Sequence, residues 1–498
     1  MISYRKLAMR VLGHSPVSAV KTARRSAAKR AAALALTAAL VVGMTLPAFA
    51  QDWYIENGDI SISAGTNGNN VTQGETTKEN DTDTVIKSSD PSTASSNTVT
   101  IDAEEGKTVN VTLDNVTINV DEGYKYGYDS NAYKTAVSVT GSGNTNIELN
   151  GNNTLTSGYG HAGLEHNKTD DSGTLTIQDE KNDDGSAKGS ASDTTGSLTA
   201  TGGYHGAGIG GSNEKDGQVT ITGGEITATG GNGAAGIGGG DGDTDAVGGD
   251  GDVTISGGTI TATGGSLGAG IGGGAYGNGT VTVTDGDITA KATGMYGAGI
   301  GGGFGAIPKD TLIGGNGTVT ISGGTITEAS GGYMAAGIGS GYQGLGTVTI
   351  EGDAVIKNAQ GGEAGAGIGS GTSGDSNILI RGNAIIENAE SKTGGAGIGS
   401  GQGFYYEDDD GLRVIDSTVG NVTIEGNAKI ENAKSGYGGS GIGGGAIGIG
   451  NVIIRGNAQI GNATGGDEGA GIGGGGIGTG DVTIEGNVTI ENAQGGAG

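Results

Sequence analysis

The stretch Val253–Gly274, with the sequence VTISGGTITATGGSLGAGIGGG, contains the pattern that decides the fold. Val253, Ile255, Ile260 and Ala262 fall on one side of an extended chain, and threonines fall on the other. Glycine pairs separate these short runs, and glycine suits the positive φ angles of tight turns. The stretch therefore predicts three short strands joined by turns, with the third strand at the Gly-Ile-Gly segment, here called the corner.

This unit repeats along most of the chain with a basic period of about 28 to 30 residues, which indicates a stacked-repeat architecture. The corner isoleucines are Ile209, Ile237, Ile271, Ile300, Ile338, Ile368, Ile398, Ile442 and Ile472. The Val-Thr-Ile-like triplets end at Leu113, Leu149, Ile177, Ile221, Ile255, Val283, Ile321, Ile350, Ile380, Ile424, Ile454 and Ile484. Three strands cannot hide their apolar face within one unit, whereas stacked units can. We infer an all-β fold, a single-stranded parallel β-helix of about twelve coils, right-handed because parallel crossovers are.

The composition excludes several other classes of protein. Glycine supplies 113 of 498 residues, whereas aromatic residues make up 4%, so the chain cannot build several ordinary cores. Collagen is excluded because there are only four prolines and no Gly-X-Y period. The absence of cysteine excludes disulfides and thiolate metal sites.

The first 50 residues have the order of a secretory signal. Eight basic residues and no acid are followed by the apolar run 31–46 and by Ala48-Phe49-Ala50, which fits an A-x-A cleavage site. An uncleaved membrane anchor is the alternative, although the apolar run is short for a membrane span. We expect export, with the mature chain extracellular or at a bacterial cell surface.

The charge of the mature chain bears on its partners. Removal of the eight basic residues lowers their total from 26 to 18 and leaves all 54 acids, so the net charge becomes −36. Such a chain repels nucleic acid and anionic membranes. We therefore expect no nucleic-acid partner, no membrane insertion of the mature chain, and a monomer.

The repeat divides the chain into four parts. Residues 1–50 form the signal, and 51–97 form an N-terminal cap with a polar linker, because an open β-helix end exposes strand edges. Residues 98–204 form irregular coils, and 205–498 form the Gly-rich array. The last residues stop midway toward another corner, so we expect the array to continue in a longer protein.

Most of the extra length in the longer coils enters between a corner and the next triplet, which predicts inserts along one edge of the rod. Inserts of this kind often mark the binding face of a repeat protein. Acids crowd two of them, and calcium prefers hard oxygen ligands on flexible loops. Calcium is therefore the cofactor candidate, with solvated loop charge as the alternative, and we expect no organic cofactor. The candidate ligands are Asp241, Asp243, Asp245, Asp250, Asp252, Glu407, Asp408, Asp409 and Asp410.

Aromatic residues gather near the turns of a chain that has few of them. Flat rings with polar edges suit the faces of sugars. The alternative is that they are ordinary turn residues without a ligand. The candidate carbohydrate contacts are Phe404, Tyr405, Tyr406, Tyr204, Tyr296, Tyr333 and Tyr437.

Catalytic constellations are weak in this sequence. The run from His161 to His166 has the wrong spacing for a metalloprotease motif and coincides with a strand corner. Carboxylates that could serve a lyase or hydrolase lie in loops without fixed spacing, and basic residues are sparse in the repeats. We therefore expect no enzymatic activity and assign no catalytic residue.

Four segments resemble a known family. They are VTLDNVTI at 111–118, IELNGNNTL at 147–155, GTLTI at 173–177 and GSLTATGG at 196–203. They resemble the carbohydrate-binding β-helix domains of secreted Gram-positive and gut-bacterial proteins, and the GAGIGGG array resembles repeats in large surface proteins of the same bacteria. The resemblance implies a right-handed β-helix, calcium between loops, and binding of plant-type polysaccharides without cleavage.

The sequence thus predicts an exported, non-catalytic carbohydrate-binding or adhesin-type β-helix whose partner is a polysaccharide or glycoconjugate. A passive stalk that presents another domain is the alternative, and a polysaccharide lyase or hydrolase is a more distant one.

Overall fold

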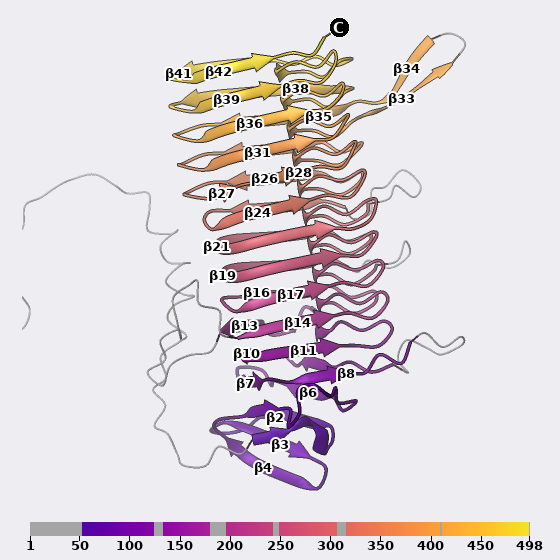
Figure 1. Cartoon of the computed structure of the whole chain (residues 1–498), viewed down its shortest axis with the longest axis vertical. Coiled ribbons are helices and arrows are strands. Elements are labelled where there is room, and N and C mark those ends of the chain that lie inside the picture. The colour runs from indigo at the N-terminus through magenta and orange to yellow at the C-terminus, as the bar shows by residue number, and fades with distance from the viewer. Residues whose placement is uncertain are drawn as a thin grey trace, which may run out of the picture. The chain divides into compact units, whose positions relative to one another are not determined.

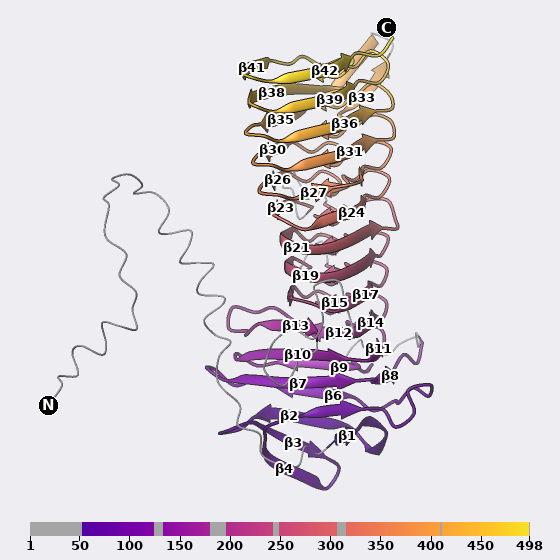
Figure 2. The same cartoon turned by 60° about the vertical axis from the view of Figure 1, so that its left-hand side comes forward.

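A computed structural model shows the architecture of the protein. It describes residues 52–123, 133–179, 196–242, 249–305, 315–408 and 411–497, and the expected signal at 1–50 lies outside this range. These residues belong to one unit, in which short strands stack coil upon coil into a rod (Figures 1 and 2). The predicted parallel β-helix is confirmed.

Each regular coil contributes one strand to each of three columns. The first column contains β1 (Asp52–Tyr54), β5 (Val85–Lys87), β7 (Thr108–Asp114), β10 (Asn144–Asn150), β13 (Leu175–Asp179), β16 (Gly217–Ile221), the first halves of β19 (Gly251–Gly264) and β21 (Gly279–Ala292), β23 (Gly317–Ile321), β26 (Gly346–Ile350), β30 (Ser376–Ile380), β35 (Thr418–Ile424), β38 (Gly448–Gly456) and β41 (Val482–Gly486). All twelve predicted triplets lie in this column, from β7 to β41.

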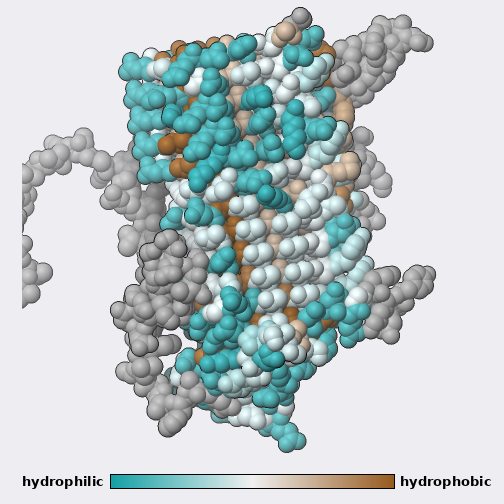
Figure 3. Space-filling model, viewed as in Figure 1, coloured by the Kyte–Doolittle hydropathy of each residue, from teal (hydrophilic) through white to brown (hydrophobic). Residues whose placement is uncertain are grey.

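The second column follows the first around each coil. It contains β8 (Thr117–Asn119), β11 (Asn152–Thr156), β14 (Ser197–Thr201), β17 (Glu225–Thr229), the second halves of β19 and β21, β24 (Thr325–Ser330), β27 (Val355–Ile356), β28 (Ala359–Gln360), β31 (Ile385–Ser391), β36 (Lys429–Ser435), β39 (Gln459–Thr464) and β42 (Thr489–Gln494). In the view of Figure 3, the surface is more hydrophilic over the C-terminal coils, where Asn, Glu and Lys replace Thr, than over the coils in the middle of the rod.

The third column consists mainly of two-residue corner strands. It contains β2 (Ile60–Ala64), β6 (Val99–Asp102), β9 (Val137–Thr140), β12 (Leu164–His166), β15 (Ile209–Gly210), β18 (Ile237–Gly238), β20 (Ile271–Gly272), β22 (Ile300–Gly301), β25 (Ile338–Gly339), β29 (Ile368–Gly369), β32 (Ile398–Gly399), β37 (Ile442–Gly443) and β40 (Ile472–Gly473).

Among the residues that the structure describes, two hairpins depart from the parallel pattern. β3 (Asn69–Gln73) and β4 (Thr76–Asp81) extend β2 antiparallel at the N-terminal end of the rod, within the stretch whose composition suggested a cap and linker. β33 (Phe404–Asp408) and β34 (Gly411–Asp416) form an antiparallel hairpin that leaves the rod (Figure 1). A short 3₁₀ turn, η1, covers Ile55–Asn57, and none of the described residues lies in a helix that is long and apolar enough to cross a membrane.

The core runs along the inside of the coils. Val253, Ile255, Ile260 and Ala262 are all buried, as their alternation predicts, and equivalent residues stack above and below them. Outside the core, asparagines on successive coils bond to one another; Asn432 Nδ2 donates to Asn388 Oδ1 at 3.2 Å, and Asn462 Nδ2 donates to Asn432 Oδ1 at 3.0 Å. Apolar burial inside thus holds each coil to the next, and in the C-terminal coils amide ladders outside add to it.

Candidate functional site: an aromatic edge

Because the strands of the third column are short, the turns on either side of each strand lie close together. One turn precedes each corner strand and the other follows it, and in the corner strands from β15 to β40 only two residues separate them. Backbone hydrogen bonds join the two turns across neighbouring coils: the N–H of Phe304 donates to Leu267 O at 2.8 Å, and that of Tyr342 donates to Tyr296 O at 3.0 Å. Side chains from both turns therefore share one edge of the rod.

Rings from these turns form a first cluster near the N-terminal coils. Tyr159 and Tyr204 are nearly parallel, with centroids 5.8 Å apart and an interplanar angle of 6°. The His205 ring meets both of them edge-on, at 4.3 Å from Tyr204 and 5.3 Å from Tyr159. Tyr133 lies 5.4 Å from Tyr159. These four rings are called the first ring cluster below.

A second ring cluster lies on the same edge, several coils further along the chain. Phe304 packs between Tyr276 at 5.1 Å, Tyr296 at 4.7 Å and Tyr342 at 6.0 Å. Tyr342 also contacts Phe404, with centroids 6.4 Å apart. Tyr296 comes from the turn before a corner, whereas the other four come from segments after one. The two clusters together are called the aromatic edge.

Part of this edge faces solvent. Tyr204 is 50% exposed, and in the second cluster Phe404 is 37% exposed while Tyr276, Tyr296, Phe304 and Tyr342 are half-buried. Burial is the main cause of the raised pKa of the Tyr342 hydroxyl. Rings that offer an apolar face and a polar tip are suited to ligands with flat apolar faces and polar rims.

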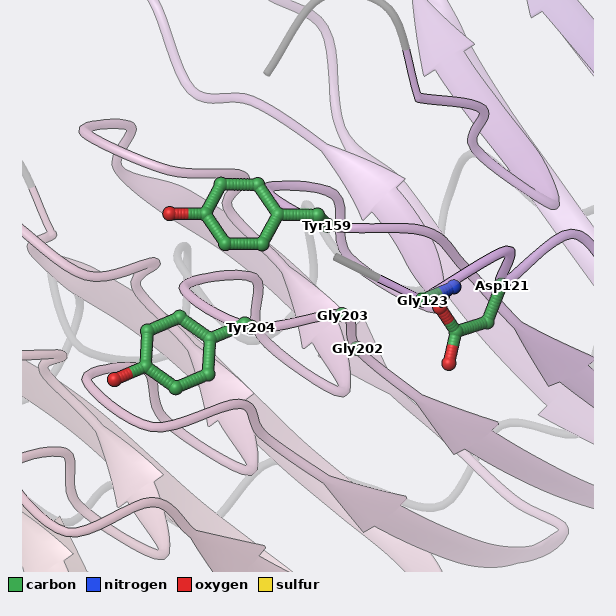
Figure 4. A pocket seen from close by; sticks show the side chains of 6 residues that line it. All are labelled: Asp121, Gly123, Tyr159, Gly202, Gly203 and Tyr204. Atoms are coloured by element: carbon green, nitrogen blue, oxygen red, sulfur yellow. Dashed lines mark hydrogen bonds between the residues drawn. The ribbon is translucent and has the colours of Figure 1, made fainter. Parts of the chain in front are cut away.

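A pocket opens beside the first ring cluster. It has a volume of about 530 Å³ and is lined by Asp121, Gly123, Tyr159, Gly202, Gly203 and Tyr204. Figure 4 shows the two tyrosines on one side of it and the Asp121 carboxylate on the other. The Nδ2 group of Asn232 donates to Tyr204 Oη at 2.8 Å, which fixes one ring tip.

The structure brings together some of the predicted aromatic contacts. Tyr296 and Phe404 join the second ring cluster, and Tyr204 joins the first. Tyr333 and Tyr437 occupy the turn before the corner in later coils, and they are 45% and 60% exposed. The backbones of Tyr405 and Tyr406 lie in β33, which leaves the rod, and their side chains lie outside the described residues.

The acids predicted for calcium in the first insert bind separate protein groups. Asp241 hydrogen-bonds to His205 Nδ1, and Asp252 forms an ion pair with Lys168 at 2.8 Å. Asp250 accepts the backbone N–H of Asn278 at 2.6 Å, one step of a ladder in which its own N–H donates to Asp216 at 2.9 Å. Among the residues that the structure describes, no three His, Asp or Glu side chains form a group that could hold a metal ion.

The remaining calcium candidates fall outside what the structure describes. Asp243, Asp245, Asp409 and Asp410 are not among the described residues. The backbones of Glu407 and Asp408 pair with β34, and their side chains are not described. Calcium at these acids therefore stays a prediction.

The histidines near the first ring cluster have separate structural partners. His161 Nδ1 lies 2.8 Å from Glu165 Oε2 and 2.8 Å from Thr135 Oγ1. His166 is buried and bonds instead to the carbonyl of Gln218 at 2.8 Å, and burial lowers its pKa. These bonds hold the edge together, in keeping with a strand corner rather than a metal-binding helix.

Sequence reasoning missed part of the edge. Tyr276, Phe304 and Tyr342 follow their corner isoleucines by four or five residues, and Phe404 follows by six. An alignment of the segments after each corner could have found this column. Tyr133 gives no such signal, because it lies in the long irregular coil before β9.

Comparison with known families agrees with the geometry. A family model described as the beta helix repeat matches residues 196–213, 219–241, 253–275 and 319–342. The chain is a parallel β-helix repeat protein. The matched β-helix repeats lie between β14 and β25, and Tyr204, His205 and Tyr342 of the two ring clusters fall within them. Comparison with curated proteins and with solved structures found no match.

Proposed function

We propose that this β-helix is an exported, non-catalytic protein that binds carbohydrate through its aromatic edge, as an adhesin or binding module at the cell surface or outside the cell. A β-helix repeat fits a structural or carbohydrate-interacting protein. The observation that supports carbohydrate binding is the placement of the rings. Side chains from two turns of each coil lie on one edge of the rod, and aromatic rings contact one another there over successive coils.

The direction of the edge suits a linear polymer. Tyr276, Tyr296, Phe304 and Tyr342 come from three successive coils, and Phe404 comes from the second coil after them, so a glycan chain parallel to the rod axis can contact several of these rings. Each stacked ring contributes roughly 1 kcal/mol, so affinity depends on engaging several at once.

The polar groups around the rings favour binding over catalysis. The carboxylates of Asp216 and Asp250 accept backbone N–H groups of the next coil, and Glu165 bonds to His161. Acids engaged in this way are poorly placed to act as a general acid and base flanking a glycosidic bond.

Replacement of rings tests the proposal. We expect the mature chain to be retained on at least one insoluble polysaccharide, and the triple variant Phe404→Ala, Tyr405→Ala, Tyr406→Ala to be retained less, with little change in melting temperature. Tyr54→Ala is the matched control, because Tyr54 is exposed to the same 37% as Phe404 but lies in β1, at the N-terminal end of the rod. Equal retention of the triple variant and the wild type would remove the hairpin rings from the proposal.

A passive stalk is the second candidate, and the ladders favour it. Asparagine ladders run outside the C-terminal coils, and buried serines run inside them, where Ser340 Oγ donates to Gly344 O and accepts the N–H of Gly371. Such ladders stiffen a rod whatever it binds. Lack of retention on every glycan, from protein with a cooperative melt, supports the stalk.

A further inference from the structure

We infer that the pocket beside Tyr159 and Tyr204 selects sugars that carry a free amino group, such as glucosamine units in a glycan. This inference rests on the proposed carbohydrate-binding function and names the class of ligand. Its basis is the pairing of two parallel rings with one carboxylate across a pocket large enough for a sugar ring (Figure 4).

The aromatic wall is held in place before any ligand arrives. Tyr159 and Tyr204 belong to the same turn of successive coils and keep the 6° interplanar angle. His205 packs edge-on against Tyr204, and its Nδ1 bonds to Asp241 in the next coil. A ligand therefore meets a preorganised surface, and little side-chain entropy is lost on binding.

The opposite wall carries a fixed negative charge. Asp121 Oδ1 accepts the N–H of Gly123 at 2.9 Å, and the N–H of Asp121 donates to Asn119 Oδ1 at 3.0 Å. Asp121 is the charged residue among the six that line the pocket. A pocket lined by both a carboxylate and tyrosine rings suits a ligand with an apolar face and a cationic group, because carboxylates and the faces of aromatic rings both attract an ammonium ion.

The charge of the whole protein acts in the same direction. With 54 acids and 26 basic residues, the chain repels polyanionic glycans and attracts cationic ones. Because this attraction acts everywhere on the rod, the test must separate Asp121 from the general charge.

Asp285 offers a matched control. Like Asp121 it is exposed, and its Oδ1 accepts the N–H of a nearby glycine, Gly286, at 2.8 Å. It lies in the middle of β21, away from the pocket lining. Asp121→Asn and Asp285→Asn thus remove the same charge from similar surroundings.

The experiment measures binding of a β-linked glucosamine hexamer, of its fully N-acetylated form and of a galacturonate hexamer, by calorimetry with the mature chain. We expect the wild type to bind the free amine about tenfold more tightly than the N-acetyl form, from one ion pair and one cation–π contact. Asp121→Asn should abolish this tenfold preference for the free amine and leave the affinity for the N-acetyl form unchanged. Asp285→Asn should keep the ratio, and Tyr204→Ala should weaken both ligands.

Four outcomes overturn the inference. Equal binding of amine and N-acetyl forms, or tighter binding of galacturonate, removes the amine selectivity but leaves the proposed function standing. An equal effect of Asp121→Asn and Asp285→Asn shows attraction by the general charge alone. Failure of all three oligomers, together with failure of the polysaccharide panel, overturns the proposed function as well.

Discussion

The glycine after each corner isoleucine gives a sharp test of how the coils stack. Gly301 has a φ of +129°, and a Cβ added there would lie 1.8 Å from the carbonyl oxygen of Gly339 in the next coil. Gly473 has the same φ of +129°, but a Cβ there would meet nothing nearer than Val482 Cγ2 at 3.6 Å. Substitution by alanine therefore imposes the same backbone strain at both sites and a collision at only one.

The cost of each substitution follows from these contacts. Alanine at a φ of this kind costs roughly 1–2 kcal/mol at either site. At Gly301 the collision must also push the next coil away, which loosens the bonds from Ile300 N–H to Gly337 O at 3.0 Å and from Gly302 N–H to Gly339 O at 2.9 Å. Two buried hydrogen bonds add about 2 kcal/mol, so Gly301→Ala should cost about 3–4 kcal/mol in total.

Denaturant unfolding, monitored by circular dichroism, measures the free energy of unfolding of Gly301→Ala and Gly473→Ala. The fluorescence of the single tryptophan provides a second probe. Trp53 is buried near the N-terminal end, where its Nε1–H donates to Asp81 Oδ2 at 3.0 Å. Its fluorescence therefore reports whether the N-terminal coils, which are distant from Gly301, unfold together with the rest of the rod. Gly106→Ala is a further control, because Gly106 has a φ of +69° and open space around its Cβ position. If Gly301→Ala lowers the free energy of unfolding no more than Gly473→Ala and Gly106→Ala do, close backbone packing between neighbouring corners does not contribute to the stability of this fold.

Two other predictions concern acid and calcium. Burial lowers the pKa of His166, so the unfolded chain takes up its proton first; the contribution of His166 to stability is complete above about pH 6.5 and falls as the pH drops through the lower folded-state pKa. Urea midpoints at pH 7.5 and 5.5 should therefore differ more for the wild type than for His166→Asn, and equal differences would contradict this role. If the acidic inserts bind calcium, the melting temperature should be higher with calcium than with chelator, because a ligand of the folded state stabilises it by mass action. Identical melts would exclude a stabilising calcium ion.

The sequence predicts the coils well because local pattern and global packing agree in them. The alternation at Val253 and Ile255 sends these side chains into the core, and the short Ile-Gly corner leaves room only for hydrogen as the side chain of its glycine. The register of neighbouring coils then follows from the repeat itself, since a shift by one residue would turn the apolar face outward.

The site is harder to predict, because it depends on which turns meet. Tyr296 precedes a corner and Phe304 follows one, and nothing local to either residue shows that their rings lie 4.7 Å apart. The acids show the opposite case, in which residues that are close in sequence do not share a site. Asp250 and Asp252 are close in sequence and both suggested calcium, yet one joins a backbone ladder and the other pairs with Lys168.

Footprinting of tyrosines tests the central proposal most directly. Nitration of the mature chain, mapped by mass spectrometry with and without a retained glycan, compares exposed tyrosines on the edge with one outside it. Protection of Tyr204, with unchanged modification of Tyr54, is the result that the proposed glycan-binding edge requires. Uniform modification of both tyrosines in the presence of a bound glycan would contradict it and would place the binding surface elsewhere on the rod.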